Sequence, residues 1–187
     1  MPNRRLIVTQ NITLDGVVDA TEGWFDPTDT EADTADIQEV LAEQTAKEDA
    51  LLLGRQTFED FRSYWPKQTD DTTGITDHLN HVRKYVVSSA LDDPQWENTT
   101  ILAGDWRGEV QALKDRPGQE ILLTGSISLA HAVIEAGLVD EYRLFVYPVV
   151  LGKGRRLFEH ATDMPDLTLI EAKPFRSGVV LLTYRAD

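Results

Sequence analysis

Apolar positions along the chain follow two different spacings. Segments such as 50–54 and 121–123 are apolar over consecutive residues, which is typical of short buried strands. Other segments place apolar residues at helical spacing, as at Ile37, Val40 and Leu41. The pattern predicts strands at 4–12, 50–54, 84–89, 99–104, 120–125, 140–150, 166–175 and 178–186, with helices at 34–47, 55–65, 75–83, 106–115 and 126–137.

The order of these elements predicts the fold class. Strands that alternate with helices indicate a mainly parallel sheet with helices on both faces. The last two strands are separated by little more than Arg176 and Ser177, so they are expected to form an antiparallel hairpin. A chain of 187 residues without a repeat or linker suits a single domain over residues 1–187. We therefore predict one three-layer α/β domain that ends in an antiparallel hairpin.

Composition narrows the possible partners. The net charge is −14, and an acidic chain is repelled by nucleic acid and by anionic membranes. There is no cysteine, so disulfides, a thiol nucleophile and cysteine-based metal sites are excluded. No apolar run approaches the ~20 residues that cross a bilayer, and no long apolar signal segment opens the chain. We expect a cytoplasmic protein that binds neither nucleic acid nor membranes.

The histidines do not form an evident metal site. His78 and His81 are three residues apart on a predicted helix and could share a face. A metal ion needs more ligands than these two, and the nearby sequence offers none. The prediction is a pair of surface histidines and no bound metal.

Small and polar residues follow three of the predicted strands. Gly54, Ser88 and Gly125 mark these strand ends. The carboxyl ends of parallel strands share one edge of the sheet, where ligands bind in open α/β folds. Helix N-termini at that edge offer unpaired N–H groups that suit phosphate. The sequence predicts a phosphate-bearing ligand, although the Gly-x-Gly-x-x-Gly dinucleotide motif is absent.

Four segments carry a resemblance to a known family. LIVTQNITLDGVVD (6–19), ALLLGRQTFEDF (50–61), KYVVSSAL (84–91) and the stretch 121–158 occur in the order expected of the dihydrofolate reductase-like superfamily. They most closely resemble the C-terminal reductase domain of bacterial riboflavin-biosynthesis enzymes and its stand-alone relatives. The resemblance implies an NADPH-dependent reductase that transfers a hydride to a small pteridine- or aminopyrimidine-like heterocycle. It also implies a homodimer, with the interface near residues 144–158.

The same resemblance implies roles for individual residues. Three residues after the second strand would cradle the cofactor phosphates, two serines would lie by the adenosine 2′-phosphate, and three residues after a later strand would meet the pyrophosphate. In that order they are Gly54, Arg55 and Thr57; Ser88 and Ser89; and Gly125, Ser126 and Ile127. The turn Leu14–Asp15–Gly16 would flank the nicotinamide. The sequence departs from the riboflavin-pathway pattern, since Thr124 replaces a usual glutamate and Val17 a usual lysine.

The sequence allows more than one interpretation of several residues. Asp15 and Asp36 are the candidate catalytic proton donors, with water as a further source. Aspartate before glycine is also a common turn pair, and an acidic position on an exposed helix is commonly solvated. Trp24 and Phe25 would either line the substrate site or belong to the core. The alternative function is a non-catalytic module that binds a nucleotide or a heterocycle on the same fold.

Overall fold

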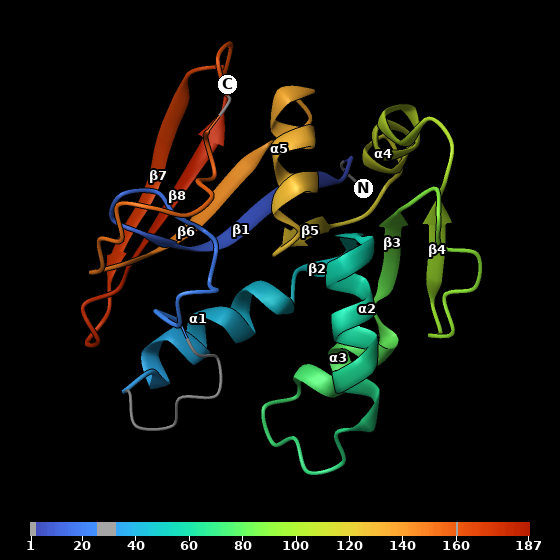
Figure 1. Cartoon of the computed structure of the whole chain (residues 1–187), viewed down its shortest axis with the longest axis horizontal. Coiled ribbons are helices and arrows are strands. Elements are labelled where there is room, and N and C mark those ends of the chain that lie inside the picture. Colours follow the sequence, from blue (N-terminus) through green and yellow to red (C-terminus); the bar gives the residue numbers. More distant parts are fainter. Residues whose placement is uncertain (1–2, 26–32, 160) are drawn as a thin grey trace.

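The computed structural model describes residues 3–25, 33–159 and 161–187, which form an eight-stranded sheet with helices around it (Figure 1). The strand order is β4-β3-β2-β5-β1-β6-β8-β7. Neighbouring pairs are parallel from β4 to β6, whereas β8 is antiparallel to both β6 and β7. The strands are β1 (Arg5–Thr13), β2 (Glu48–Gly54), β3 (Arg83–Val87), β4 (Thr99–Leu102), β5 (Glu120–Thr124), β6 (Glu141–Tyr147), β7 (Leu167–Pro174) and β8 (Val180–Ala186).

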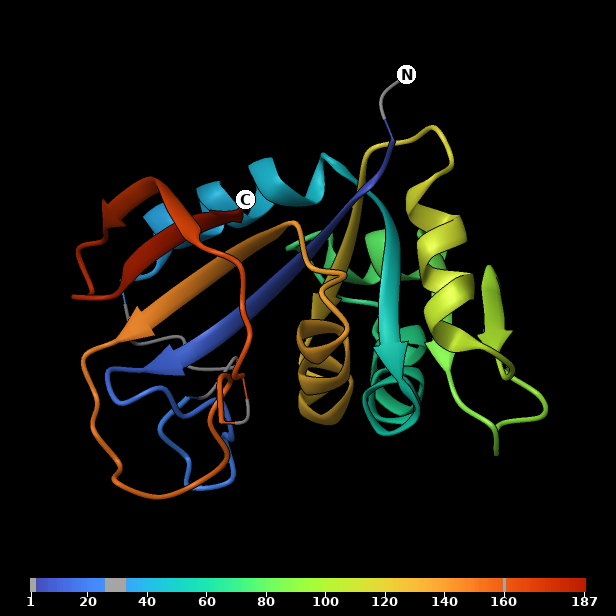
Figure 2. The same ribbon diagram turned by 90° about the horizontal axis from the view of Figure 1, so that it is seen from above.

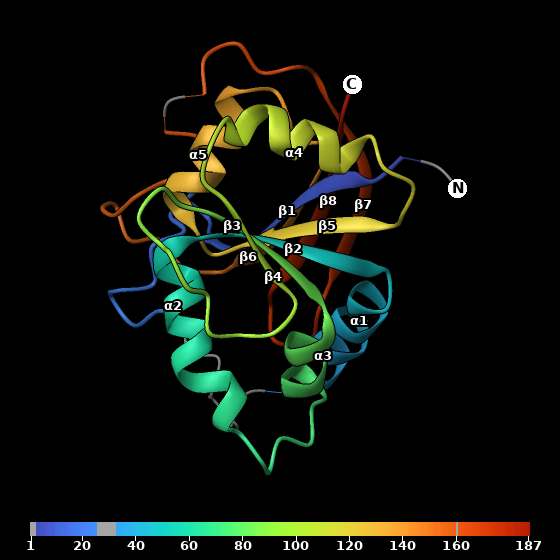
Figure 3. The same cartoon turned by 90° about the vertical axis from the view of Figure 1, so that its right-hand side faces the viewer.

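Helices cover both faces of this sheet. They are α1 (Ala35–Thr45), α2 (Arg55–Tyr64), the 3-10 helix η1 (Trp65–Lys67), α3 (Ile75–His81), α4 (Trp106–Lys114) and α5 (Ile127–Glu135). Seen along the sheet, α4 and α5 lie on one side and α1, α2 and α3 on the other (Figure 3). The predicted α/β fold with a mainly parallel sheet and a C-terminal hairpin is confirmed.

Alternation along the strands explains the two buried layers. Successive side chains of a strand point to opposite faces, so Leu6 and Val8 pack with α4 and α5 while Ile7 packs with α2 and α3. Ile7 pairs with Glu141 of β6, which places Phe145 on the same face as Ile7. Phe145 packs with Val40 of α1. The helix α1 therefore shares a face with α2 and α3 but covers the other half of the sheet.

Several predicted elements end earlier in the structure than the sequence pattern predicted, and two of these ends have a clear physical cause. The strand predicted to reach residue 150 ends at Tyr147, because Pro148 has no N–H to donate to a neighbouring strand. The helix predicted to reach residue 83 ends at His81. The ammonium of Lys84 donates to the carbonyls of Leu79 (2.6 Å) and Val82 (2.9 Å), which satisfies carbonyl groups at this helix end.

The loops after β1 and after β6 lie together beyond the carboxyl ends of their strands (Figure 2). The backbone N–H of Leu14 donates to the carbonyl of Val149 at 2.9 Å. Val17 forms an isolated antiparallel bridge with Arg156. These contacts join the predicted nicotinamide turn to the loop that follows β6.

Candidate functional site

The starts of α2 and α5 are held together at the carboxyl edge of the sheet. Their strands, β2 and β5, are neighbours, and each leads almost directly into its helix. The backbone N–H of Gly54 donates to Ser126 Oγ at 2.9 Å. The backbone N–H of Ser126 donates in turn to Thr57 Oγ1 at 3.0 Å. Three residues that were predicted to bind phosphate thus form one hydrogen-bonded unit.

The turn between β5 and α5 has an unusual backbone. Gly125 and Ser126 have φ values of 57° and 44°, in the left-handed region that favours glycine. The carbonyl of Gly125 accepts a hydrogen bond from Gln10 Nε2 at 2.7 Å, and Gln10 is itself buried. This turn is therefore fixed from the sheet side by Gln10 and from α2 by Thr57.

The N-terminus of α5 offers backbone donors at this edge. Its first residue is Ile127, and the N–H of Ala130 donates to the carbonyl of Ser126 at 2.8 Å. The N–H groups that precede Ala130 in the helix have no acceptor within it. Ser126 does not cap them, because its hydroxyl accepts from Gly54. This arrangement suits an anionic ligand, since the N-terminus also carries a partial positive charge.

Arg55 is the first residue of α2 and directly follows Gly54 of the hydrogen-bonded unit. Its side chain is 51% exposed, and its Nη1 lies 3.5 Å from Glu59 Oε2. An exposed ion pair of this length contributes little to stability. The guanidinium is accordingly accessible to a phosphate at the start of the helix.

The two serines after β3 have different environments. Ser88 is buried, and its Oγ accepts from the backbone N–H groups of Ala90 and Leu91, both at 3.1 Å. Ser89 is exposed. Ser88 therefore shapes the turn, whereas Ser89 presents its hydroxyl to solvent at the carboxyl edge.

Asp15 is held firmly within its turn. Its carboxylate accepts from the hydroxyl of Thr13 at 2.6 Å and from the N–H of Gly152 at 2.7 Å. Arg156 Nη2 lies 3.6 Å from the same carboxylate. The hydrogen bonds from Thr13 and Gly152 lower the pKa of Asp15 to about 2. At neutral pH it is ionised, and its contacts are those of a residue that anchors the turn.

The residues on either side of Asp15 complete the turn. Gly16 has a φ of 85°, and its N–H donates to the carbonyl of Thr13 at 3.0 Å. Leu14 is 64% exposed although it is large and apolar. An exposed leucine on a well-anchored turn is a suitable contact for a flat ring.

Trp24 and Phe25 pack against Tyr147, the last residue of β6. The ring centroids of Trp24 and Phe25 lie 5.4 and 5.6 Å from that of Tyr147, both edge to face. Trp24 Nε1 also donates to the carbonyl of Asp19 at 2.8 Å. Burial raises the pKa of the Tyr147 hydroxyl, which is therefore protonated at neutral pH. Tyr147 was not predicted to belong to the site, and its only signal in the sequence was its place just before Pro148.

Asp36 lies in the first turn of α1 and contacts the hairpin. Its Oδ2 accepts from the backbone N–H of Arg176 at 3.0 Å, and Arg176 Nε lies 3.6 Å away. These contacts lower the pKa of Asp36. Asp36 thereby joins α1 to the turn between β7 and β8.

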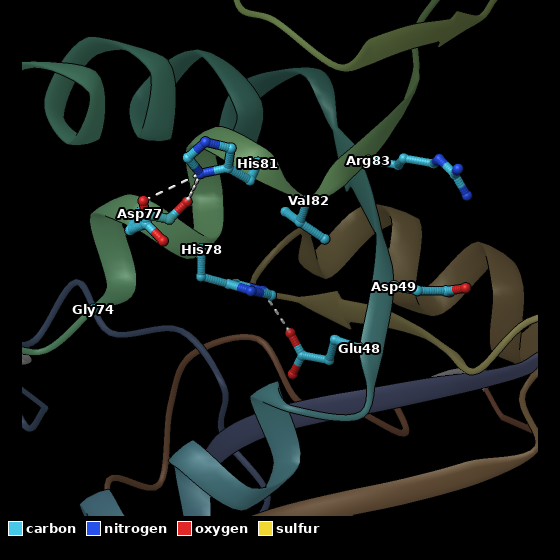
Figure 4. Close-up of a pocket in the computed structure, with 8 residues that line it drawn as sticks. All are labelled: Glu48, Asp49, Gly74, Asp77, His78, His81, Val82 and Arg83. Atoms are coloured by element: carbon cyan, nitrogen blue, oxygen red, sulfur yellow. Dashed lines mark hydrogen bonds and ion pairs between the residues drawn. The ribbon is translucent and has the colours of Figure 1, made fainter.

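Two cavities lie at the opposite, amino edge of the sheet. One has a volume of about 530 Å³ and lies between the start of β2 and α3 (Figure 4). His78 points toward Glu48 there, at 3.1 Å, whereas His81 contacts Asp77 on its own helix. Within residues 3–25, 33–159 and 161–187, no group of three or more potential ligands could hold a metal ion. The second cavity is lined by Arg5 and Arg143, among other residues.

The geometry defines a domain of the dihydrofolate reductase-like fold. A pyrimidine reductase-like protein from Corynebacterium diphtheriae superposes with a TM-score of 0.68 at 14% identity, covering 98% of this chain and 92% of that one. Dihydrofolate reductase from Enterococcus faecalis, solved in complex with NADP(H), gives a TM-score of 0.64 at 17% identity and covers 98% and 96% of the two chains. At these identities the likeness shows the fold.

Sequence similarity identifies the family. Residues 4–181 match the RibD C-terminal domain family. The uncharacterized protein YyaP of Bacillus subtilis (strain 168) is 34% identical over 186 residues, which cover 98% of this chain and 96% of YyaP. The chain belongs to the RibD C-terminal domain family, which confirms the resemblance found in the sequence. None of the helices in the described residues is long and apolar enough to cross a membrane.

Proposed function

We propose that this protein is an NADPH-dependent reductase that transfers a hydride to a small heterocyclic substrate. The hydrogen-bonded unit of Gly54, Thr57 and Ser126 is the observation that carries the proposal. It holds two helix N-termini side by side at the carboxyl edge, where nucleotides bind in open α/β folds. The structural relatives, a pyrimidine reductase-like protein and a dihydrofolate reductase, support the same class of reaction.

The residues present fit such a cofactor. The N–H groups at the start of α5, from Ile127 onward, would hold the pyrophosphate. Arg55, at the start of α2, would pair with the 2′-phosphate. Ser89 would donate to the 2′-phosphate, with Ser88 shaping its turn. Leu14 and Gly16 would flank the nicotinamide. The bound cofactor supplies the hydride, and the protein contributes orientation and electrostatics.

A proton must also reach the reduced C=N or C=O group. Asp15 and Asp36 both have lowered pKa values, so both are ionised at neutral pH. Neither carries a proton to donate, which favours water as the proton source. Asp15 would instead position the turn over the reacting ring. Trp24, Phe25 and Tyr147 would offer aromatic surface to a planar substrate.

The alternative is a non-catalytic module that binds a nucleotide or heterocycle. The hydrogen bonds that Asp15 accepts from Thr13 and Gly152 favour this alternative, because they keep Asp15 ionised and leave the turn without a general acid. Fluorescence titration with NADPH and NADH, followed by NADPH oxidation with a panel of pteridines and aminopyrimidines, separates the two. We expect saturable binding that prefers NADPH and turnover of at least one substrate. Binding without turnover would support the module, and equal affinity for both cofactors would contradict the NADPH assignment.

We also propose that the protein is a homodimer. Phe158, the last residue of the predicted interface segment, is 36% exposed and packs edge to face on Tyr142 at 5.5 Å. Tyr142 pairs with Tyr184 of β8, which pairs with Leu169 of the edge strand β7, itself 51% exposed. Exposed apolar side chains on this side of the sheet, Phe158 and Leu169, are candidates for contact with a second copy of the chain. Light scattering at micromolar concentration should give the mass of a dimer, and a monomer would contradict the proposal.

A further inference from the structure

Two arginines and two glutamates form a closed cluster at the amino edge of the sheet. Arg143 donates from Nε to Glu141 at 2.7 Å and from Nη2 to Glu120 at 2.9 Å. Arg5 donates to the same two carboxylates at 2.8 and 2.6 Å. Arg5, Glu120 and Glu141 are the first residues of β1, β5 and β6, so the register of three adjacent strands assembles the cluster.

The cluster contains two atoms without a partner. Among the described residues, Glu120 Oε2 and Arg143 Nη1 make no hydrogen bond although both are buried. The side chains of Glu120 and Arg143 are each only 6% exposed. Leaving a buried charged group short of a hydrogen bond is costly. One unpaired acceptor and one unpaired donor therefore remain in a single cluster.

Both side chains line a cavity of about 400 Å³ between α1 and the sheet. This volume is within the usual range of small-molecule sites. Its lining includes four basic and four acidic side chains, so the cavity has no net formal charge. Neither an anion nor a cation is favoured by such a lining. A neutral molecule that can donate to Glu120 and accept from Arg143 matches it best.

We propose that this cavity binds a small neutral molecule with an amide or lactam edge. The N–H of that edge would donate to Glu120 Oε2, and the adjacent C=O would accept from Arg143 Nη1. Arg5 is the exposed member of the cluster, with 51% of its side chain accessible. Arg5 lines the cavity and contacts Glu120, so its movement is the route by which we expect the molecule to reach the two buried atoms. The site lies at the opposite edge of the sheet from the proposed cofactor site and does not depend on it.

A pair of matched probes tests the proposal. 2-Pyridone carries the adjacent N–H and C=O, whereas N-methyl-2-pyridone has lost the donor. Both should be titrated against the full-length protein by ligand-observed NMR, with acetate and guanidinium as charged probes. We expect 2-pyridone to bind at least about tenfold more tightly than its N-methyl analogue, because a hydrogen bond to a charged group is lost. The same titration with added NADPH should give an unchanged affinity for 2-pyridone.

Two variants on α1 locate the binding. Gln44 lines the cavity, whereas Gln38 is exposed on the same helix and does not. Gln44→Trp should fill the cavity and reduce 2-pyridone binding at least about tenfold, while Gln38→Trp should leave it unchanged. Both leave the charged cluster intact. The proposal is overturned if no probe binds saturably or if Gln44→Trp has no effect. It is also overturned if acetate or guanidinium binds as tightly as 2-pyridone, or if the two pyridones bind equally tightly. The two atoms would then be satisfied by water alone.

Discussion

The two edges of the sheet use their polar groups in different ways. At the carboxyl edge, Gly54, Ser126 and Thr57 are joined through backbone N–H groups and hydroxyls. At the amino edge, charged side chains pair with one another, as Arg143 does with Glu120 and Glu141. The carboxyl edge also has two successive residues with positive φ. One edge leaves helix donors available to a ligand, whereas the other satisfies most of its charges internally.

This difference indicates how binding and stability are divided in the fold. Backbone donors at a fixed turn hold a ligand without burying a charge of the protein. In a buried ion pair the two charges mostly compensate each other, but the loss of one partner leaves an uncompensated charge. Loss of a charge from the amino-edge cluster should therefore mainly change stability, and variants at the carboxyl-edge turn should mainly change cofactor affinity.

The largest effect is expected from Arg143→Met. This change leaves Glu120 and Glu141 buried with only Arg5 to compensate them, so the free energy of unfolding should fall by about 3–5 kcal/mol. Urea unfolding measures the change. Arg55→Ala removes an exposed pair within α2 and should change stability by less than about 0.5 kcal/mol. A similar small loss in Arg143→Met would mean that the cluster is hydrated in solution.

A second effect concerns Lys84, which is fully buried near the start of β3. Burial lowers the pKa of Lys84 to about 8 from 10.5. Between these values the unfolded chain binds more protons than the folded one, so this lysine makes stability rise with pH. At 1.36 kcal/mol per pKa unit, the rise is about 3 kcal/mol between pH 7 and pH 11. Neutral Lys84 can still donate to the carbonyls of Leu79 and Val82.

Comparison with Lys84→Met isolates the contribution of Lys84 to the pH dependence of stability. Other lysines and the tyrosines titrate in the same range, but they do so in both proteins. As the pH rises from 8 to 10.5, the unfolding free energy of the wild type should increase relative to that of Lys84→Met. A difference that is constant across this range would show that Lys84 is not desolvated in the folded state.

At the carboxyl edge, Arg55→Ala should alter cofactor selectivity. NADPH and NADH differ by the 2′-phosphate, and the chain's charge of −14 disfavours that extra charge at long range. Selectivity must then come from local contacts such as a two-pronged arginine–phosphate pair. We expect Arg55→Ala to weaken NADPH about ten- to a hundredfold while NADH changes little. Equal losses for both cofactors would indicate that Arg55 acts mainly through Glu59.

The elements at the carboxyl edge could be predicted because their signals are local. Glycine or serine at or just beyond the end of an apolar run marks Gly54, Ser88 and Gly125 as strand ends, and parallel strands bring such ends to one edge. The amino-edge cluster could not be predicted in this way. Arg5, Glu120 and Glu141 look like the polar borders of exposed strand starts, and only the strand register brings them together.

Contacts between loops far apart in the chain could not be predicted from the sequence pattern either. Asp15 has the ordinary context of a turn residue, and its bond to Gly152 depends on how the loop after β6 returns to β1. Tyr147 meets Trp24 and Phe25 for the same reason. Spacing within one segment carries no information about such pairs, since they are set by the pairing of β1 with β6.

The smallest effects are expected from alanine substitutions at two glycines, which separate backbone strain from a change in cofactor binding. Gly125 and Gly137 both have positive φ, at 57° and 64°. A methyl group on Gly137 would meet no atom within 4 Å, whereas one on Gly125 would lie 3.3 Å from Thr57 Cγ2. Both alanine variants should lose about 1 kcal/mol of stability from backbone strain.

Gly125→Ala should also weaken NADPH binding severalfold, because pressure on Thr57 disturbs the hydrogen bond that its hydroxyl accepts from Ser126. Thr57→Ser removes the crowding methyl group but keeps the accepting hydroxyl, so adding it to Gly125→Ala should restore NADPH affinity without restoring the lost stability. Weaker NADPH binding in Gly137→Ala, or no recovery in the double variant, would show that the loss of affinity arises from backbone strain rather than from displacement of Thr57.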